Sequence, residues 1–347
     1  MLGELSSMEI EQLIRKLPKA EQHIHIVGST RPKTLLWLAE DGGLNKPFKT
    51  SKDVQNFFQF TSFPQFINVY CTVVDCITKE NQFERIGYEM LKSEAQCNVQ
   101  YVEASFSPLD HVLRGLDYGK MLNAINRGVD RARMDFAVEC NLRIDLVRNY
   151  GPEKGMEILD WVESKRDNII SVDLGGSEER LPAKPYKSVY QRARKMGLHL
   201  VAHAGEAAGP DSIWQAVTEL EVERIGHGVT AIQEPRLMEH LKKRNIAIEA
   251  CPKSNVRTRV VHTIKDHPIR VFNDLDLAVT VNTDDPAIFA TDMNNEYLQL
   301  HDQLGFSLQE LFKFSLNAVN SSFLPEESKS KMRKSFTKTH DRILNEE

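Results

Sequence analysis

Short apolar runs alternate with longer amphipathic stretches along most of the chain. Eight runs have the length and apolar content of buried strands, and they cover residues 20–26, 99–106, 142–147, 169–174, 198–202, 224–226, 246–250 and 277–281. Between them, apolar residues recur every three or four positions, as in the stripe over residues 121–136, which indicates helices. Strands that alternate with helices predict parallel βαβ units, and eight such units predict a closed (β/α)8 barrel.

Two further regions add helices to this pattern. Residues from about 30 to 95, after the first strand, show helical apolar spacing and predict a helical insert. After the last strand, Ser307 and Glu310 have the spacing of a capping box before an apolar stripe, which predicts a helical tail. We therefore expect an α/β protein with one domain over residues 1–347, a TIM barrel with a helical insert and a C-terminal helical tail. A doubly wound open sheet is the alternative, but eight strands favour the barrel.

Composition and charge exclude several classes of partner. The 347 residues carry a formal net charge of −5 with scattered basic residues, so we expect no nucleic-acid partner. No apolar run approaches membrane-spanning length and no basic-then-apolar leader is present, so we expect no membrane partner and a cytoplasmic location. The five cysteines lack a CxxC pair, which argues against a disulfide framework and against a thiolate zinc site. Nothing in the sequence indicates an oligomeric state.

Side chains that can bind a metal stand at or just past the ends of four apolar runs, and we expect none within the runs. They are His23 and His25, His203 and Glu206, His227, and Asp284 and Asp285. His23 and His25 are two apart, so in a strand both imidazoles point to the same side. The adjacent carboxylates Asp284 and Asp285 repel each other, and a cation would remove much of that repulsion.

Each patch taken alone also fits an ordinary structural explanation, such as a pair of core histidines or a hydrated loop. Their joint pattern favours a site, because strand ends on one face of a barrel are where sites are built. Together they offer three imidazoles and a carboxylate that could hold one zinc ion, with a glutamate and an aspartate left for chemistry.

An ordered series of motifs resembles the adenosine deaminase family of the amidohydrolase superfamily over nearly the whole chain. The motifs lie at residues 17–25, 173–178, 203–206, 224–228, 251–255 and 282–286. The resemblance implies one Zn²⁺ per subunit, held by His23, His25, His203 and Asp284. It also implies a small purine nucleoside as substrate, with adenosine or 2′-deoxyadenosine hydrolysed to inosine or 2′-deoxyinosine and ammonia as the default reaction.

The resemblance assigns a role to each remaining site residue. Glu206 is expected to protonate purine N1, and His227 to activate or orient the attacking water. Asp285 is expected to bind N7, and the Gly176 backbone to contact N3, with His25 also beside the substrate. Protonation at N1 makes C6 electrophilic, so Glu206 must be neutral near pH 7, and burial is expected to raise its pKa.

Val27 is the main departure from the family pattern. Most members carry an acidic residue there that contacts the ribose 5′-hydroxyl, and valine cannot form that hydrogen bond. A 5′-modified adenosine, such as 6-aminodeoxyfutalosine or methylthioadenosine, is therefore an alternative substrate. Adenine is a second alternative, although the adenine-specific branch tends to have aspartate where Gly226 stands and serine where Gly176 stands.

Two alternatives lie outside this reaction. A two-metal amidohydrolase usually needs a bridging lysine on the fourth strand, and residues 169–174 contain none. A catalytically silent binding protein on the same barrel is the non-enzyme alternative. It would have no need of the four ligands together with Glu206.

Overall fold

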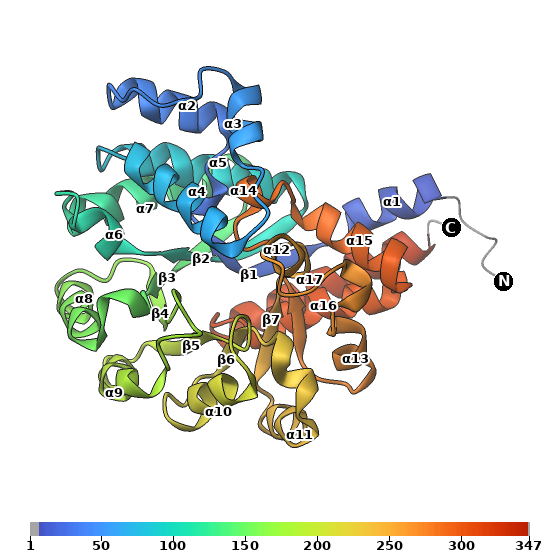
Figure 1. The fold of residues 1–347 in the computed structure, drawn as a ribbon. Helices are drawn as coiled ribbons and strands as arrows, with labels where there is room; N and C mark the ends of the chain where they lie inside the picture. Colours follow the sequence, from blue (N-terminus) through green and yellow to red (C-terminus); the bar gives the residue numbers. More distant parts are fainter. Residues whose placement is uncertain (1–6, 346–347) are drawn as a thin grey trace.

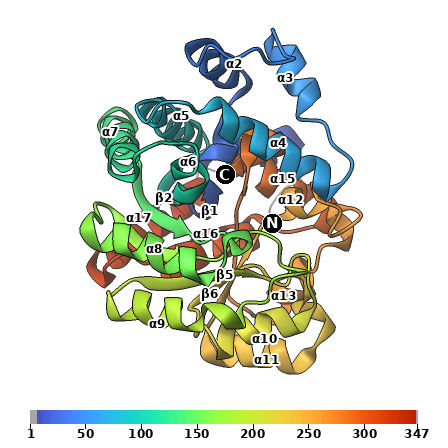
Figure 2. The same ribbon diagram turned by 60° about the vertical axis from the view of Figure 1, so that its left-hand side comes forward.

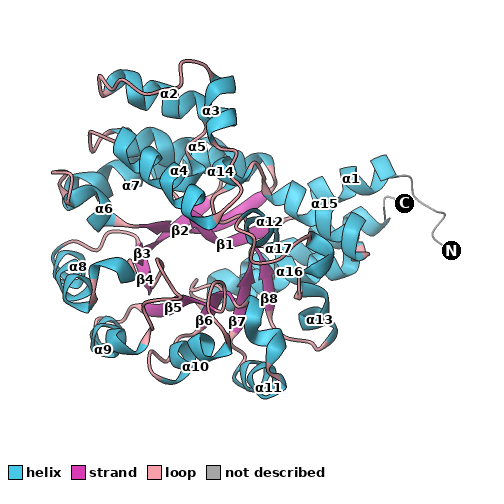
Figure 3. Cartoon of the chain, in the orientation of Figure 1, coloured by secondary structure: helices cyan, strands magenta, loops and turns pink. Residues whose placement is uncertain are grey.

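Eight strands form one parallel sheet in sequence order in the computed structural model, which describes residues 7–345 (Figures 1 and 3). The strands are β1 (Lys19–His25), β2 (Val99–Phe106), β3 (Glu139–Asp145), β4 (Ile169–Asp173), β5 (His199–Ala204), β6 (Arg224–His227), β7 (Ala247–Ala250) and β8 (Val279–Val281). Each consecutive pair is parallel. The predicted TIM-like barrel is confirmed.

The first and last strands are joined by a short seam rather than by a full ladder. One isolated backbone bridge links Ile24 to Asp284. Next to it, the Asn282 side-chain oxygen accepts hydrogen bonds from the backbone N–H groups of Gln22 at 2.8 Å and His23 at 3.2 Å. The barrel is therefore nearly closed, and its seam places the histidines of β1 beside Asp284.

Helices cover the outside of the barrel (Figure 2). Those between successive strands are α7 (Tyr118–Phe136), α8 (Pro152–Ser164), α9 (Lys187–Lys195), α10 (Pro210–Thr218), α11 (Pro235–Arg244) and α13 (Ile269–Asp274). The helix before β2 is α5 (Gln82–Gln96), which packs along α7. Gly128 permits this close packing, because a Cβ there would stand 2.4 Å from the Glu84 carbonyl oxygen.

Additional helices extend the barrel at two places. Between β1 and α5 lie α2 (Pro32–Asp41), α3 (Ser51–Phe57) and α4 (Phe63–Cys76), of which α2 and α3 project away from the barrel in Figure 1. Helix α1 (Ser7–Lys16) and the tail helices α15 (Met293–Leu304), α16 (Leu308–Ser321) and α17 (Glu326–Asn345) gather on another side. Helix α16 packs on β1 and β8 and so covers the seam.

The tail begins as its sequence predicts. The Ser307 side chain accepts a hydrogen bond from the Glu310 backbone N–H at 3.2 Å, and the Glu310 side chain accepts one from the Ser307 backbone N–H at 2.8 Å. This reciprocal pair satisfies two backbone donors at the start of α16. Three short helices, α6 (Pro108–Val112), α12 (Pro252–Arg257) and α14 (Pro286–Phe289), follow β2, β7 and β8. None of the helices in the described part of the chain is long and apolar enough to cross a membrane.

Two expectations about the strands were wrong. His203 lies within β5 and not on the loop after it, because pairing with β6 continues through His203–Gly226 and Ala204–His227. Metal-competent and charged side chains also occur inside the strands, where Glu103, Arg143 and Glu249 are fully buried. Arg143 pairs with Glu249 and with the site, as described next, whereas Glu103 pairs with Arg224 on β6.

Candidate active site

Three imidazoles and one carboxylate converge at the ends of β1, β5 and β8. The ring of His23 lies 5.4 Å from that of His25 and 4.5 Å from that of His203, between centroids. Oδ1 of Asp284 lies 3.6 Å from Nε2 of His23 and 3.3 Å from Nε2 of His25. Each of the four residues is at most 9% exposed. The structure thus brings together the four residues that the sequence put forward as zinc ligands.

The orientation of the histidines fits a bound cation. Nδ1 of His23 lies 3.0 Å from Glu249 Oε2, whereas its Nε2 is buried and has no hydrogen-bond partner. A carboxylate only accepts hydrogen bonds, so Nδ1 carries the proton and Nε2 presents a lone pair to the cluster. His203 is held in the same way, with Nδ1 lying 3.1 Å from Asp173 Oδ1. Imidazoles oriented by carboxylates are typical of zinc sites, and so is a set of histidines with one carboxylate.

Arg143 on β3 connects the two carboxylates that orient these histidines. It donates to Glu249 Oε2 at 2.9 Å and to Asp173 Oδ2 at 2.6 Å, and all three side chains are fully buried. Burial alone would raise the pKa of Glu249, but Arg143 and Arg224 hold it well below its usual range. Sequence reasoning missed this network. Its only signal is a charged residue inside an apolar strand, as in Leu142–Arg143–Ile144.

Glu206 lies just past β5, close to His227. Its Oε2 is 3.6 Å from Nε2 of His227. Burial, reinforced by the charge of Asp284, raises the pKa of Glu206 to about 8, so its carboxyl can hold a proton near neutral pH. The buried carboxylate of Glu178 fixes the surrounding loop by accepting hydrogen bonds from backbone N–H groups, including that of Glu206 at 3.0 Å and that of Ala207 at 2.7 Å.

Two site residues have an unusual backbone. His227 and Asp284 both have φ of +64°, in the left-handed region that non-glycine residues seldom adopt. Such conformations persist only where the surrounding structure enforces them, and they gather at functional sites. In both cases the turn comes at or just past a strand end and directs the side chain toward the cluster.

Asp285 and Gly176 also reach the site. Asp285 is 3% exposed, and burial together with the charge of Asp284 raises its pKa well above the usual range. Its Oδ1 is buried without a hydrogen-bond partner. Gly176, beyond β4, has φ of +90°, and a Cβ there would stand 2.6 Å from the Asn149 side-chain oxygen. A larger residue at position 176 would therefore disturb this loop.

Cys251 stands beside the cluster, although the sequence argued against a thiolate site. Its sulfur lies within 4.8 Å of potential ligand atoms of His23, His227 and Asp284. Burial raises the pKa of the Cys251 thiol well above its usual range. Its Sγ also lies 3.6 Å from the backbone carbonyl oxygen of Glu249, to which the thiol can donate.

A cavity of about 970 Å³ opens from this cluster. His25, Gly176, His203, Glu206, His227, Asp284 and Asp285 all line it, whereas His23 is fully buried beneath. Away from the cluster, Phe63, Phe66, Ile67 and Tyr70 of α4 form an apolar wall. Arg180 and Arg259 line the same cavity and are exposed to solvent. Asp110, Asp145 and Glu179 line it as well, so the cavity has a polar end at the cluster, a partly aromatic wall and charges of both signs.

Val27 does not line this cavity. It belongs to the turn η1 (Val27–Ser29) after β1, is 3% exposed and packs in the hydrophobic core. Any influence of Val27 on a ligand must therefore act through the shape of the turn.

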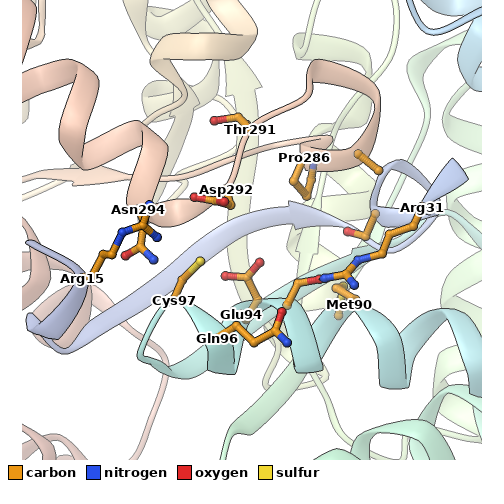
Figure 4. Close-up of a pocket in the computed structure, with 13 residues that line it drawn as sticks. Arg15, Arg31, Met90, Glu94, Gln96, Cys97, Pro286, Thr291, Asp292 and Asn294 are labelled. Atoms are coloured by element: carbon orange, nitrogen blue, oxygen red, sulfur yellow. The ribbon is translucent and has the colours of Figure 1, made fainter. Parts of the chain in front are cut away.

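A smaller cavity of about 310 Å³ lies beside β1, between α5 and the start of α15 (Figure 4). Glu94, Cys97 and Asp292 line it, with Arg15 and Arg31 toward its two ends. None of the residues predicted for the site lines this cavity. We therefore assign the chemistry to the larger one.

Comparisons with known proteins identify a matching family model and related sequences and structures. The sequence model of the family described as Adenosine deaminase matches residues 18–339. An aminodeoxyfutalosine deaminase of Streptomyces coelicolor is 36% identical over 93% of this chain and 84% of its own length. An adenine deaminase of Acinetobacter baylyi is 31% identical over 93% of this chain and 97% of its own. Among solved structures, an amidohydrolase from Burkholderia ambifaria with bound Zn has a TM-score of 0.92 at 25% identity, and the match covers 99% of this chain and 96% of that one.

Proposed function

The chain belongs to the adenosine deaminase family, and we propose that it is a zinc-dependent deaminase of a 6-aminopurine nucleoside with a large 5′ substituent, of the 6-aminodeoxyfutalosine type. Deamination of a purine follows from the family and from relatives named as purine deaminases. Adenosine, the default expected from the motifs, has less support than the 5′-modified alternative, because the relatives carry the names aminodeoxyfutalosine deaminase and adenine deaminase.

The size and the lining of the cavity beyond the cluster support a substrate with a large 5′ substituent. Its volume of about 970 Å³ is near the upper end of the ~300–1,000 Å³ typical of sites for drug-sized ligands. A purine base at the polar end would leave the aromatic wall of α4 unfilled. A substituent on the ribose 5′ carbon would reach toward Phe66 and Tyr70 and fill this part of the cavity.

The side chains at the polar end suit hydrolysis at C6. When bound by His23, His25, His203 and Asp284, zinc supplies a hydroxide nucleophile near neutral pH by lowering the pKa of water. Glu206 holds a proton on its carboxyl and donates it to purine N1, which makes C6 electrophilic. His227 orients the attacking oxygen. The proton of the added hydroxyl then passes to the 6-amino group, the C6–N6 bond breaks, and ammonia leaves as the C6 carbonyl forms.

The remaining groups orient the base. Asp285, when protonated, can donate to N7, and the backbone N–H at Gly176 can reach N3. Holding the base at three edge atoms aligns C6 with the nucleophile, and such alignment is a large part of enzymatic rate enhancement.

Free adenine is the second candidate, because an adenine deaminase is among the relatives at 31% identity. Two glycines argue against it. A Cβ at Gly226 would stand 3.0 Å from Cε1 of His23, so the aspartate expected of the adenine branch would crowd the cluster. Gly176 likewise replaces the serine of that branch.

The test is a comparison of kcat/KM for ammonia release from 6-aminodeoxyfutalosine, methylthioadenosine, adenosine, 2′-deoxyadenosine and adenine, with zinc-loaded protein. We expect the 5′-modified nucleosides to be the best substrates. Removal of zinc with a chelator should abolish turnover, and zinc should restore it. A higher kcat/KM for adenine or adenosine than for both modified nucleosides would contradict the proposal.

A further inference from the structure

A chain of hydrogen bonds connects the backbone at the start of α13 to His227. The Ile269 backbone N–H donates to Nδ1 of His267 at 3.1 Å. Nε2 of His267 lies 3.1 Å from Asn255 Oδ1, and Asn255 Nδ2 lies 3.2 Å from His227 Nδ1. The three side-chain residues are 3%, 0% and 1% exposed, in the order 267, 255 and 227, so water does not compete for these bonds.

The first bond determines the proton position on His267. A backbone N–H can only donate, so Nδ1 of His267 accepts and carries no proton. The single proton of the neutral ring is therefore on Nε2, facing Asn255. Burial lowers the pKa of His267 to about 3, which agrees with a neutral ring.

Through the next two bonds, the proton position on His267 determines the proton position on His227. Because Nε2–H of His267 donates, the Asn255 oxygen must face His267 and its amide nitrogen must face His227. An amide nitrogen only donates, so Nδ1 of His227 accepts and carries no proton. The Asn255 backbone is also held in place, since its N–H donates to the Cys251 carbonyl at 3.0 Å and its carbonyl accepts from the Val261 N–H at 3.0 Å.

We propose that Asn255 is a positioning residue that, with His267, fixes His227 as the neutral tautomer with its proton on Nε2. Nε2 is the atom that faces the site, 3.6 Å from Glu206 Oε2 and 3.9 Å from Asp284 Oδ2. His227 thus meets the attacking oxygen as a hydrogen-bond donor and not as a proton acceptor. That catalytic consequence rests on the proposed function, whereas the tautomer does not. Fixing the tautomer in this way excludes the other neutral ring, which has its proton on Nδ1 and presents no proton to the site.

Nuclear magnetic resonance of zinc-loaded protein labelled with ¹⁵N-histidine measures the tautomer directly. The His227 signals are assigned by their loss in His227→Gln. We expect Nε2 protonated and Nδ1 unprotonated. Asn255→Asp should move the proton to Nδ1, because carboxylate oxygens only accept. A proton on His227 Nδ1 in the unmodified protein, or an unchanged tautomer in Asn255→Asp, would overturn the proposal.

A matched pair at position 267 separates the hydrogen bond from packing. His267→Gln keeps a side-chain N–H donor, whereas His267→Met has a similar length and no donor. We expect His267→Gln to keep the His227 tautomer, and His267→Met to give a mixture because the Asn255 amide can then turn over. Asn255→Asp should lower kcat about 100-fold, as loss of a donor to a developing oxyanion typically does, with KM changed less than about threefold.

The spectroscopic result tests the tautomer proposal, and the kinetic result tests the proposed function, so the two can be refuted independently. If His227 has the same tautomer in His267→Gln and His267→Met, the proposed role of His267 in fixing that tautomer is overturned. If the variants show the expected tautomers but the zinc-loaded protein deaminates none of the purines tested, the role of Asn255 and His267 is supported and the proposed function is wrong.

Discussion

Gly28 and Asp285 lie in direct contact: a Cβ on Gly28 would stand 1.7 Å from Asp285 Oδ1 and 2.5 Å from Asp285 Cβ. The first atom belongs to a mobile carboxyl group, but the second is fixed to the backbone. Only glycine at position 28 therefore lets Asp285 keep its orientation. Through this contact the turn after β1, which includes Val27, can affect Asp285 at the polar end of the cavity.

Gly28→Ala should displace Asp285 while leaving the zinc ligands in place. We expect zinc content to be unchanged and kcat/KM to fall about 10- to 100-fold, a loss of ~1.4–2.8 kcal/mol of transition-state stabilisation. A 7-deaza nucleoside, which lacks N7, should show a much smaller loss than its parent. Gly209→Ala is the matched control, because nothing lies within 4 Å of a Cβ there. An equal loss on both nucleosides would argue against the role of Asp285 at N7.

Glu206→Gln tests the proton donor. Glutamine keeps the size and removes the proton whose retention follows from burial of the carboxyl. We expect normal zinc content and a kcat lower by about 10²–10⁴-fold, the range for loss of general acid–base catalysis. Full activity of the zinc-loaded variant would rule out donation from Glu206 to N1.

Glu249→Gln tests the orientation of His23. The amide loses the charge that holds the Nδ1 proton of His23 and that balances Arg143 and Arg224. We expect zinc affinity, measured by competition with a fluorescent chelator, to fall about 10- to 100-fold. Replacement of an exposed acid, such as Glu327→Gln, should leave it unchanged. Unaltered affinity in Glu249→Gln would show that the Glu249 charge is not needed to orient His23.

Glu94→Gln should make the protein more resistant to unfolding, and increasingly so as the pH rises. Burial raises the pKa of Glu94 to about 8, against about 4.3 for an unfolded glutamate. Between these values the unfolded chain releases a proton that the folded chain keeps, so stability falls with rising pH by up to ~1.4 kcal/mol per pH unit. Urea unfolding of both proteins at pH 5.5, 6.5 and 7.5 measures this. A difference that is constant across pH would refute it.

The barrel could be predicted because its strands are short apolar runs with helical stretches between them. The strand ends could not, because they depend on pairing partners far away in sequence. Strand β5 pairs with β4 through His199 and Leu200 and with β6 through residues 201–204, and the second pairing includes His203 in the sheet. Composition of the local segment carries no information about such a partner.

The site could also be predicted from the sequence only in part. His25, His203 and Asp284 lie close together, because the carboxyl ends of parallel strands meet at one face. Glu249 and Arg143, which hold His23 and Asp173 in place, lie inside strands and outside every motif, whereas Asp173 and Asn255 lie in motifs that gave no sign of their contacts. Glu249 meets His23 across 226 residues of chain, and Asn255 meets His267 only after the intervening turn has folded. Val27 is the opposite case. The family pattern marks this position, but its side chain is buried and does not line the cavity.

The seam between β1 and β8 has a consequence for the order of events during synthesis. His23 and His25 leave the ribosome early, but Asp284 and Asn282, which complete their surroundings, follow more than 250 residues later. In a nascent chain these two histidines therefore lack Asp284 and Asn282 until more than 250 further residues have been made, and contacts of such separation form slowly. A cation held by all four candidate ligands therefore requires synthesis to proceed past β8, and a chain truncated before β8 would keep His23, His25 and His203 but lack Asp284.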